Sequence, residues 1–141
     1  MKRVFIDTNV FIDFIARRAG FYENAALIVS LAYRKKIWLQ ISALSFATAS
    51  YILENHYKMK KDAILDDYIR FIELCGITTV DHETVKASVE APFDDFEDAM
   101  QYISAREAGA NFIVTRNKAD FTGSVIPVME PQEFLKRIVN Q

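Results

Sequence analysis

Short apolar runs alternate along this chain with longer segments in which apolar residues recur every three or four positions. Such alternation is typical of strands followed by amphipathic helices, and it favours a parallel sheet covered by helices on both faces. The expected fold class is α/β: a three-layer α/β/α sandwich with a mostly parallel five-stranded sheet. The predicted strands are residues 4–6, 37–41, 77–80, 111–115 and 124–129.

Six segments have the spacing of amphipathic helices. Two helical stretches, 43–57 and 61–75, follow one another with no strand candidate between them, so we expect a helical hairpin between the second and third strands. Glycine after a helical pattern suits a left-handed C-terminal cap. We expect such caps at Gly20, Gly76 and Gly109. The apolar positions of the predicted helices span 10–15, 25–33, 46–53, 64–72, 96–103 and 134–138.

Composition favours one compact unit. Of the 141 residues, 51% are hydrophobic, and no linker or repeat divides them, so we expect a single domain over residues 1–141. The net charge of −2 does not indicate a strongly basic nucleic-acid-binding domain. Carboxylates gathered around a metal ion would lower this sum, so nucleic acid stays open as a partner.

The compartment is predicted from cysteine content and hydropathy. Cys75 is the single cysteine, which excludes an intramolecular disulfide and favours a reducing environment. No uncharged apolar run has the length of a membrane span, and the opening MKRVFID leads into the first strand without a signal-peptide core. We expect a cytoplasmic protein with no membrane segment.

The stretch VFIDTNVFID, residues 4–13, begins as a buried strand and then presents a carboxylate. Asp7 is costly to desolvate at the end of such a strand. Thr8 and Asn9 directly after it could cap the following helix at a lower cost. We therefore interpret Asp7 as a functional residue rather than as a plain helix cap.

Other oxygen-bearing side chains are expected at the same edge of the sheet. Ligands of open parallel sheets bind outside the carboxyl ends of the strands. Clustered carboxylates repel one another unless a cation neutralises them, and Mg²⁺ or Mn²⁺ prefers oxygen ligands. The side chains are Asp94, Asp95, Glu97 and Asp98 from FDDFEDAM, and Thr115, Arg116, Asn117 and Asp120 from NFIVTRNKADF.

Each of these groups also has a purely structural interpretation. Asp95 and Asp98 are spaced like a capping box, and negative charge stabilises a helix start by about 0.3–1 kcal/mol. Asp120 could be an ordinary helix-start residue, and the residues at 115–117 could serve only the turn after the strand. We expect solvated charges at Asp13, Asp94 and Glu97.

Four segments together resemble a known family, the PIN domain, which is the metal-dependent ribonuclease fold of VapC-type toxins. They are DTNVFID, ISALSFATASYIL, DFEDAMQ and TRNKADF, in order and across nearly the whole chain. The resemblance implies three or four acids around one or two Mg²⁺ or Mn²⁺ ions, with Asp7 and Asp98 as metal ligands. It also implies RNA as substrate, an antitoxin protein as partner, and a homodimer.

Two of the four acidic positions implied by the resemblance hold neutral residues. Counted from Ser42, the acid on the helix after the second strand falls at Thr48, and Glu54 lies nearly two turns further on. The fourth acid falls at Asn117, and we expect Asp120 to compensate from the same loop.

The leading hypothesis is a metal-dependent ribonuclease, the toxin of a toxin–antitoxin pair. Its expected catalytic residues are Asp7, Asp98, Asp120 and Asn117, and its expected substrate contacts are Thr8, Asn9, Thr115 and Arg116. One alternative, favoured by Thr48 and Asn117, is a degenerate PIN fold that binds RNA or a protein without cutting. The other is a phosphoryl-transfer enzyme with a nucleophilic Asp7. Such an enzyme normally has a second Asp two residues later, and this chain has Asn9 there, which makes this alternative the weaker one.

Two groups of cations are candidates for phosphate contacts, residues 34–36 and the stretch HYKMKK at 56–61. Either group could equally be a solvated helix end that complements the helix dipole. We expect Trp38 in the core and His56 and His82 at the surface.

Overall fold

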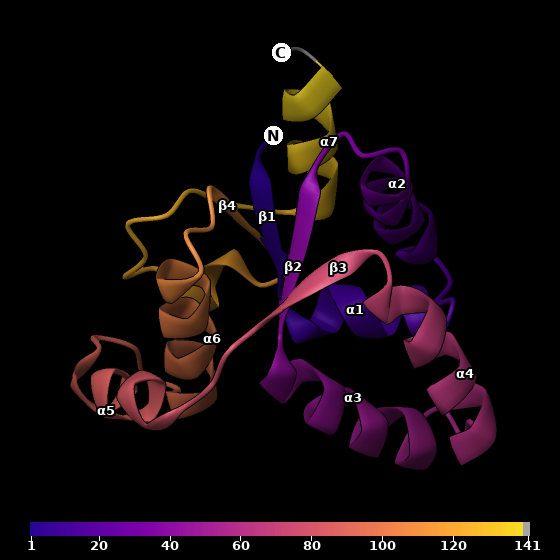
Figure 1. The fold of residues 1–141 in the computed structure, drawn as a ribbon, viewed down its shortest axis with the longest axis horizontal. Coiled ribbons are helices and arrows are strands. Elements are labelled where there is room, and N and C mark those ends of the chain that lie inside the picture. Colours follow the sequence, from indigo (N-terminus) through magenta and orange to yellow (C-terminus); the bar gives the residue numbers. More distant parts are fainter. Residues whose placement is uncertain (140–141) are drawn as a thin grey trace.

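The strands form one sheet in which every neighbouring pair is parallel. This architecture comes from a computed structural model, which describes residues 1–139. The strand order is β3-β2-β1-β4-β5, so β1 lies at the centre (Figure 1). The strands are β1 Arg3–Ile6, β2 Trp38–Ser42, β3 Cys75–Thr78, β4 Phe112–Val114 and β5 Val128–Met129.

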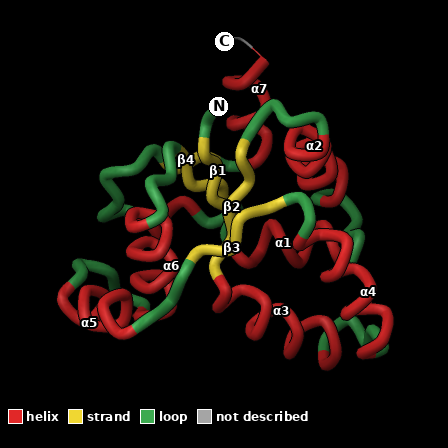
Figure 2. Tube along the Cα trace, in the orientation of Figure 1, coloured by secondary structure: helices red, strands yellow, loops and turns green. Residues whose placement is uncertain are grey.

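Helices cover both faces of this sheet and give the three predicted layers. Helices α1, α2, α3, α4 and α7 pack on one face, and α5 and α6 on the other (Figures 1 and 2). The α3–α4 hairpin lies between β2 and β3 in the chain, as predicted. The helices are α1 Thr8–Ile15, α2 Tyr22–Tyr33, α3 Ala43–Asn55, α4 Lys61–Ile72, α5 His82–Glu90, α6 Phe96–Glu107, the 3₁₀ helix η1 Lys118–Phe121, and α7 Pro131–Val139.

Alternating side chains of the central strands supply two separate cores. In β1, Val4 and Ile6 face the larger core, and Phe5 faces the smaller one beneath α6. In β4, Val114 and Ile113 divide in the same way. Because these side chains are removed from water on both faces, the hydrophobic effect holds a helical layer on each side of the sheet.

Phe11 on α1 is at the centre of the larger core. Its ring centroid lies 5.0 Å from that of Phe46, 5.5 Å from Tyr68 and 4.8 Å from Phe71. Phe46 belongs to α3, and the other two belong to α4. These aromatic contacts fix the α3–α4 hairpin against α1.

Three helices begin close to the carboxyl edge of the sheet, and each start is capped. Asp7, Ser42 and Asp95 accept hydrogen bonds from backbone N–H groups in the first turns of α1, α3 and α6. Gln101 of α6 donates hydrogen bonds to Thr8 in the first turn of α1 and to Ser45 in the first turn of α3, so the three helices lie together at this edge. The carboxyl edge of the sheet is therefore enclosed by helix N-termini.

One of the three predicted glycine caps is confirmed: Gly109 follows the C-cap residue of α6 and has a positive φ of 71°. Gly20 also has a positive φ, 87°, but α1 ends at Ile15 and Arg17, with a φ of 51°, takes the left-handed position after it, so the predicted cap at Gly20 is wrong. The prediction for Gly76 is wrong, because this residue lies inside β3. A Cβ atom there would approach the indole Nε1 of Trp38 to 3.2 Å. Trp38 lies across the sheet surface and is 50% exposed, so the prediction that it is a core residue is also wrong.

Several elements differ from their predicted extent, and three of them differ in ways that the side chains explain or that change the sheet. Helix α5 was not predicted, because its buried residues Thr84 and Ser88 are polar and its Val89 is exposed. Strand β3 begins at Cys75, two residues early, where it pairs with Leu39 of β2. Strand β5 is much shorter than residues 124–129.

Among the described residues, no helix is long and apolar enough to span a membrane.

Replacing Phe11 with alanine should lower the free energy of unfolding by about 3–5 kcal/mol, because it opens a cavity between α1 and the hairpin. Urea unfolding followed by circular dichroism measures the change. Tyr51→Ala is the control on α3, where the side chain is largely exposed, and it should change the free energy by no more than about 0.5 kcal/mol. Equal losses for both variants would contradict the assigned core.

Candidate active site

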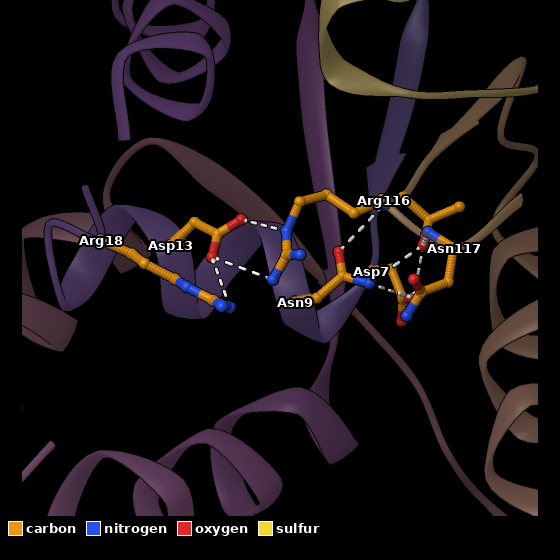
Figure 3. A network of polar contacts seen from close by, with 7 residues as sticks. Asp7, Asn9, Asp13, Arg18, Arg116 and Asn117 are labelled. Atoms are coloured by element: carbon orange, nitrogen blue, oxygen red, sulfur yellow. Dashed lines mark hydrogen bonds and ion pairs between the residues drawn. The ribbon is translucent and has the colours of Figure 1, made fainter. Parts of the chain in front are cut away.

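Asp7 lies at the carboxyl end of β1 and is only 7% exposed. Its Oδ1 accepts a hydrogen bond from the backbone N–H of Thr8 at 2.8 Å. Its Oδ2 accepts from the Thr115 hydroxyl at 2.9 Å and from Asn9 Nδ2 at 3.3 Å (Figure 3). Asp7 therefore caps α1 and also joins the end of β1 to the end of β4.

Burial raises the pKa of Asp7 above its ordinary value. The hydrogen bonds from Thr115 and Thr8 oppose this effect, whereas the negative charges of Asp120 and Glu97 add to it. The charges of two acids from distant parts of the sequence therefore contribute to the raised pKa of Asp7.

Thr115 serves mainly to hold Asp7 in place. Its hydroxyl donates to Asp7 and accepts hydrogen bonds from Asn9 Nδ2 at 3.2 Å and from the backbone N–H of Asn117 at 3.1 Å. One donor and two acceptors exhaust the capacity of a hydroxyl. Since Thr115 is also fully buried, the geometry favours a positioning role over the predicted contact with substrate.

Asp98 and Asp120 line one cavity of about 140 Å³ between the first turn of α6 and η1, and Asp95 lines it too. The pKa of Asp98 is raised to about 7, first by burial and then by the charges of Asp120, Asp95, Asp7 and Glu97. Every charge that acts on Asp98 in this way is negative. Acids from two of the three segments, Asp98 and Asp120, therefore line one cavity, and the charge of Asp7 acts on Asp98.

The donor chemistry of this region suits a hard divalent cation. All of its ionisable donors are carboxylates, and a cation would relieve the repulsion that raises the pKa of Asp98. Within residues 1–139, however, no three Asp, Glu, His or Cys side chains are grouped closely enough to hold a metal ion as they stand. The acids would have to draw together to bind Mg²⁺ or Mn²⁺.

A buried polar network lies next to Asp7 and was not predicted. Gln101 Nε2 on α6 donates to the hydroxyls of Thr8 and Ser45, each at 3.0 Å, and these hydroxyls lie 2.7 Å apart. Gln101 Oε1 is buried and has no hydrogen-bond partner among the described residues. The Thr8 hydroxyl, predicted to contact substrate, is thus engaged beneath the site.

Arg116 does not point into the acidic region. Its Nε donates to Asp13 Oδ2 at 2.6 Å (Figure 3). Its guanidinium lies 4.1 Å from the ring centroid of Phe21. Asp13 is 1% exposed, so the expectation that it is a solvated charge is wrong. Arg18 also approaches Asp13, at 4.0 Å. The geometry gives Arg116 a structural ion pair in place of the predicted substrate contact.

Asn9 and Asn117 occupy the loop side of the site. Asn9 Oδ1 accepts a hydrogen bond from the backbone N–H of Arg116 at 3.2 Å, so α1 holds the loop after β4. Asn117 is exposed next to this contact. Its exposure leaves its side chain amide open to a ligand.

The fold and the site define a class: an α/β protein with acids at the carboxyl edge of a parallel sheet, carried by β1, the start of α6 and the loop after β4. A family model for the PIN domain matches residues 3–119. The chain therefore belongs to the PIN domain family, which confirms the resemblance and the fold class.

Similar proteins are known from bacteria. Ribonuclease VapC1 from Aquifex aeolicus (strain VF5) is 25% identical over 138 residues, which are 96% of this chain and 95% of that protein. VapBC2 from Rickettsia felis, solved with a DNA fragment from their promoter, matches with a TM-score of 0.64 and 20% identity over 91% of this chain and 97% of the other. Mycobacterium tuberculosis VapC20, a sarcin-ricin loop cleaving toxin, matches with a TM-score of 0.61 and 16% identity over 78% and 86%.

In the metal-free protein, stability should fall as pH rises from the ordinary carboxyl value of 3.8 through about 7, because folded Asp98 holds its proton more tightly than unfolded Asp98. Thermal unfolding in EDTA at pH 5 and pH 8 measures this slope. Asp98→Asn should make this slope shallower without removing it, because burial raises the pKa of Asp7 as well, whereas Asp62→Asn on α4 should leave it unchanged. A slope unaffected by Asp98→Asn would contradict the assignment.

Arg116→Met should lower the free energy of unfolding by about 3 kcal/mol at pH 7, because it leaves the Asp13 carboxylate buried without its main partner. Urea unfolding measures the loss. The double variant Asp13→Leu/Arg116→Met should recover most of it, since neither charge then remains. Arg18→Met is the control and should cost less than about 1 kcal/mol, because its contact with Asp13 is long and exposed.

Proposed function

We propose that this chain is a ribonuclease of the PIN type that hydrolyses RNA with Mg²⁺ or Mn²⁺, and that it is the toxin of a toxin–antitoxin pair. The observation that carries the proposal is that Asp98 of α6 and Asp120 of η1 line one cavity, and that the charge of Asp7, at the end of β1, acts on Asp98. The similarity to Ribonuclease VapC1 over nearly the full length of both chains supports it.

Asp7 and Asp98 are the proposed metal ligands, with Asp120 and Asn117 completing the site. A bound divalent cation would supply an activated water and stabilise negative charge on the scissile phosphate. Asp7 is held for this task by Thr115 and the start of α1. The remaining predicted contact, Asn9, orients Asp7 and the loop after β4 through opposite ends of its amide.

The proposed RNA path follows the carboxyl edge of the sheet. The cationic residues 34–36 directly precede β2 and therefore lie at the opposite, amino edge. The group at 56–61 lies between α3 and α4, at the far end of α3 from the site. These groups fit solvated helix ends better than contacts beside the scissile phosphate, although a long RNA could reach the second group.

The partners and surroundings are also proposals. We propose a cognate antitoxin protein, in line with the similarity to VapBC2 and to the toxin VapC20, and a homodimer, as the family resemblance implies. We further propose a single domain over residues 1–141 that acts in the cytoplasm. The lone cysteine and the RNA substrate support this location.

A second candidate function is a PIN fold that binds RNA or a protein without cutting. It is favoured by the neutral residues Thr48 and Asn117, and by the spread of the carboxylates within the described part of the chain. Calorimetry with Mn²⁺ separates the two functions. Saturable binding supports the nuclease, and its absence supports the non-cutting binder.

Asp7→Asn should reduce Mn²⁺-dependent cleavage of total bacterial RNA by more than about a hundredfold, because the loss of a direct ligand exceeds the usual 10–100-fold cost of an outer-shell change. Gel electrophoresis of the RNA measures cleavage, and circular dichroism checks the fold. Asp62→Asn is the control and should cleave at the wild-type rate. Undiminished cleavage by Asp7→Asn would remove Asp7 from the mechanism.

A further inference from the structure

Another cavity, of about 280 Å³, lies on the α6 face of the sheet, between β2, β3 and the last turn of α6. Trp38 and Gln40 of β2 line it together with Gly76 of β3 and Glu107 of α6. Among the described residues that line it, none is an acid of the candidate active site. Glu107 follows Asp98 by nine residues on the same helix, which is about 14 Å along its axis. The cavity is therefore separate from the acidic site.

Gln40 holds an unused hydrogen-bond acceptor at the wall of this cavity. Its side chain is 6% exposed, and its Nε2 donates to the backbone carbonyl of Ala108 at 3.1 Å. This hydrogen bond fixes the orientation of the amide, so Oε1 is the remaining atom. Gln40 Oε1 is buried and has no hydrogen-bond partner among the described residues. A buried acceptor without a partner is unfavourable, so a ligand that brings a donor to it would be stabilised.

The only charged side chain among the described residues that line the cavity is Glu107. Its Oε1 accepts a hydrogen bond from the Thr84 hydroxyl at 2.7 Å, which leaves Oε2 open to a ligand. The hydroxyls of Thr78 and Ser104, which also line the cavity, lie 2.6 Å apart, and Ser104 donates to the carbonyl of Thr79. The free groups are therefore acceptors, and they favour a cationic ligand that carries donors.

Trp38 gives the cavity an aromatic wall, and Gly76 opens a path to it. Gly76 pairs directly with Gln40, and a Cβ atom on it would approach Trp38 Nε1 to 3.2 Å. The indole already contacts one guanidinium, that of Arg3 on β1, at 5.5 Å from the ring centroid. Arg3 does not line the cavity, and half of Trp38 remains exposed.

The strand beside the cavity has a free edge in an acidic part of the chain. β3 is at the end of the strand order, so one of its edges has no neighbouring strand (Figure 1). Such an edge can accept an extended peptide as an additional strand. No Lys or Arg occurs from residue 71 to 85, whereas Glu73, Asp81 and Glu83 do. This charge favours a cationic peptide over the phosphates of a nucleic acid.

We propose that the cavity binds the guanidinium group of an arginine on an extended segment of a partner protein. A guanidinium is planar and carries only donors, so it can stack on Trp38 and donate to Gln40 Oε1 and Glu107 Oε2. The segment pairs with the free edge of β3, and its arginine passes over Gly76. Alternate residues of a strand face opposite sides, so its apolar neighbours lie beside Ile77, which is 46% exposed. This site does not depend on the proposed nuclease activity.

Trp38 is the only tryptophan of the chain, so protein fluorescence reports on this cavity. The peptide acetyl-Thr-Val-Arg-Val-Thr-amide should change it saturably. The same peptide with citrulline, which lacks the charge, or with lysine, which lacks the planar group, should bind at least about tenfold more weakly. Acetyl-arginine-amide should also bind more weakly, because it cannot pair with β3.

Four results of this titration would overturn the inference. They are no saturable change with the arginine peptide, equal affinity for the citrulline peptide, equal affinity for acetyl-arginine-amide, and tighter binding of adenosine monophosphate than of the arginine peptide. The third would indicate a small-molecule site, and the fourth a nucleotide site.

Two variants test the assigned contacts. Glu107→Gln removes the charge, and Gly76→Val fills the path from the free edge to Gln40, so each should weaken binding of the arginine peptide at least about tenfold. Glu83→Gln, an exposed acid on α5 that does not line the cavity, is the control and should bind as the wild type does. Circular dichroism checks each fold. Glu107 is exposed, so Glu107→Gln decides even if Gly76→Val does not fold, and wild-type affinity in Glu107→Gln would refute the site.

Discussion

Burial of the Asp7 carboxylate at the end of the central strand is the constraint on which the site depends. A desolvated carboxylate is unfavourable unless donors surround it, and three donors do so here, from Thr8, Asn9 and Thr115. Each donor belongs to the start of α1 or the end of β4. The hydrogen bonds that stabilise this buried carboxylate therefore join the start of α1 to the end of β4 at the centre of the carboxyl edge.

The remaining acids give this edge of the sheet an excess of negative charge. The negative charges of Asp120 and Glu97 act on Asp7, and the charge of Asp7 acts on Asp98. The cations nearest to Asp120 in sequence pair with other acids: Arg116 with Asp13, and Lys118 with Glu133. Within the described residues, no ion pair involves Asp7, Asp98, Asp120 or Glu97, and hydrogen bonds surround the carboxylate of Asp7 alone. A site of this kind gains most from a divalent cation, because one ion can offset several repulsions at once.

Sequence reasoning succeeded where one local pattern determines the outcome. The run Val4–Phe5–Ile6 predicts the central strand, which is confirmed, and the cap at Asp95 is confirmed at the start of α6. It failed where the outcome depends on tertiary contacts. Nothing in the residues around Asp13 distinguishes it from a solvated acid. It is buried together with Arg116, which comes from the loop after β4 and donates a hydrogen bond to it. The Gln101 network and the Thr48–Glu97 contact likewise depend on how α6 crosses α3, which no periodicity encodes.

The ion pair between Arg116 and Asp13 belongs to the site even though neither residue faces the acids. Arg116 is held at its backbone by Asn9 and at its guanidinium by Asp13, and both partners lie on α1. The next residue, Asn117, is fixed through its N–H to Thr115. Three anchors on two consecutive residues, Arg116 and Asn117, leave the loop little freedom before η1, which carries Asp120. The distance from Asp120 to Asp7 is therefore governed by α1, and a change at Asp13 should disturb the acidic edge through this loop rather than through charge.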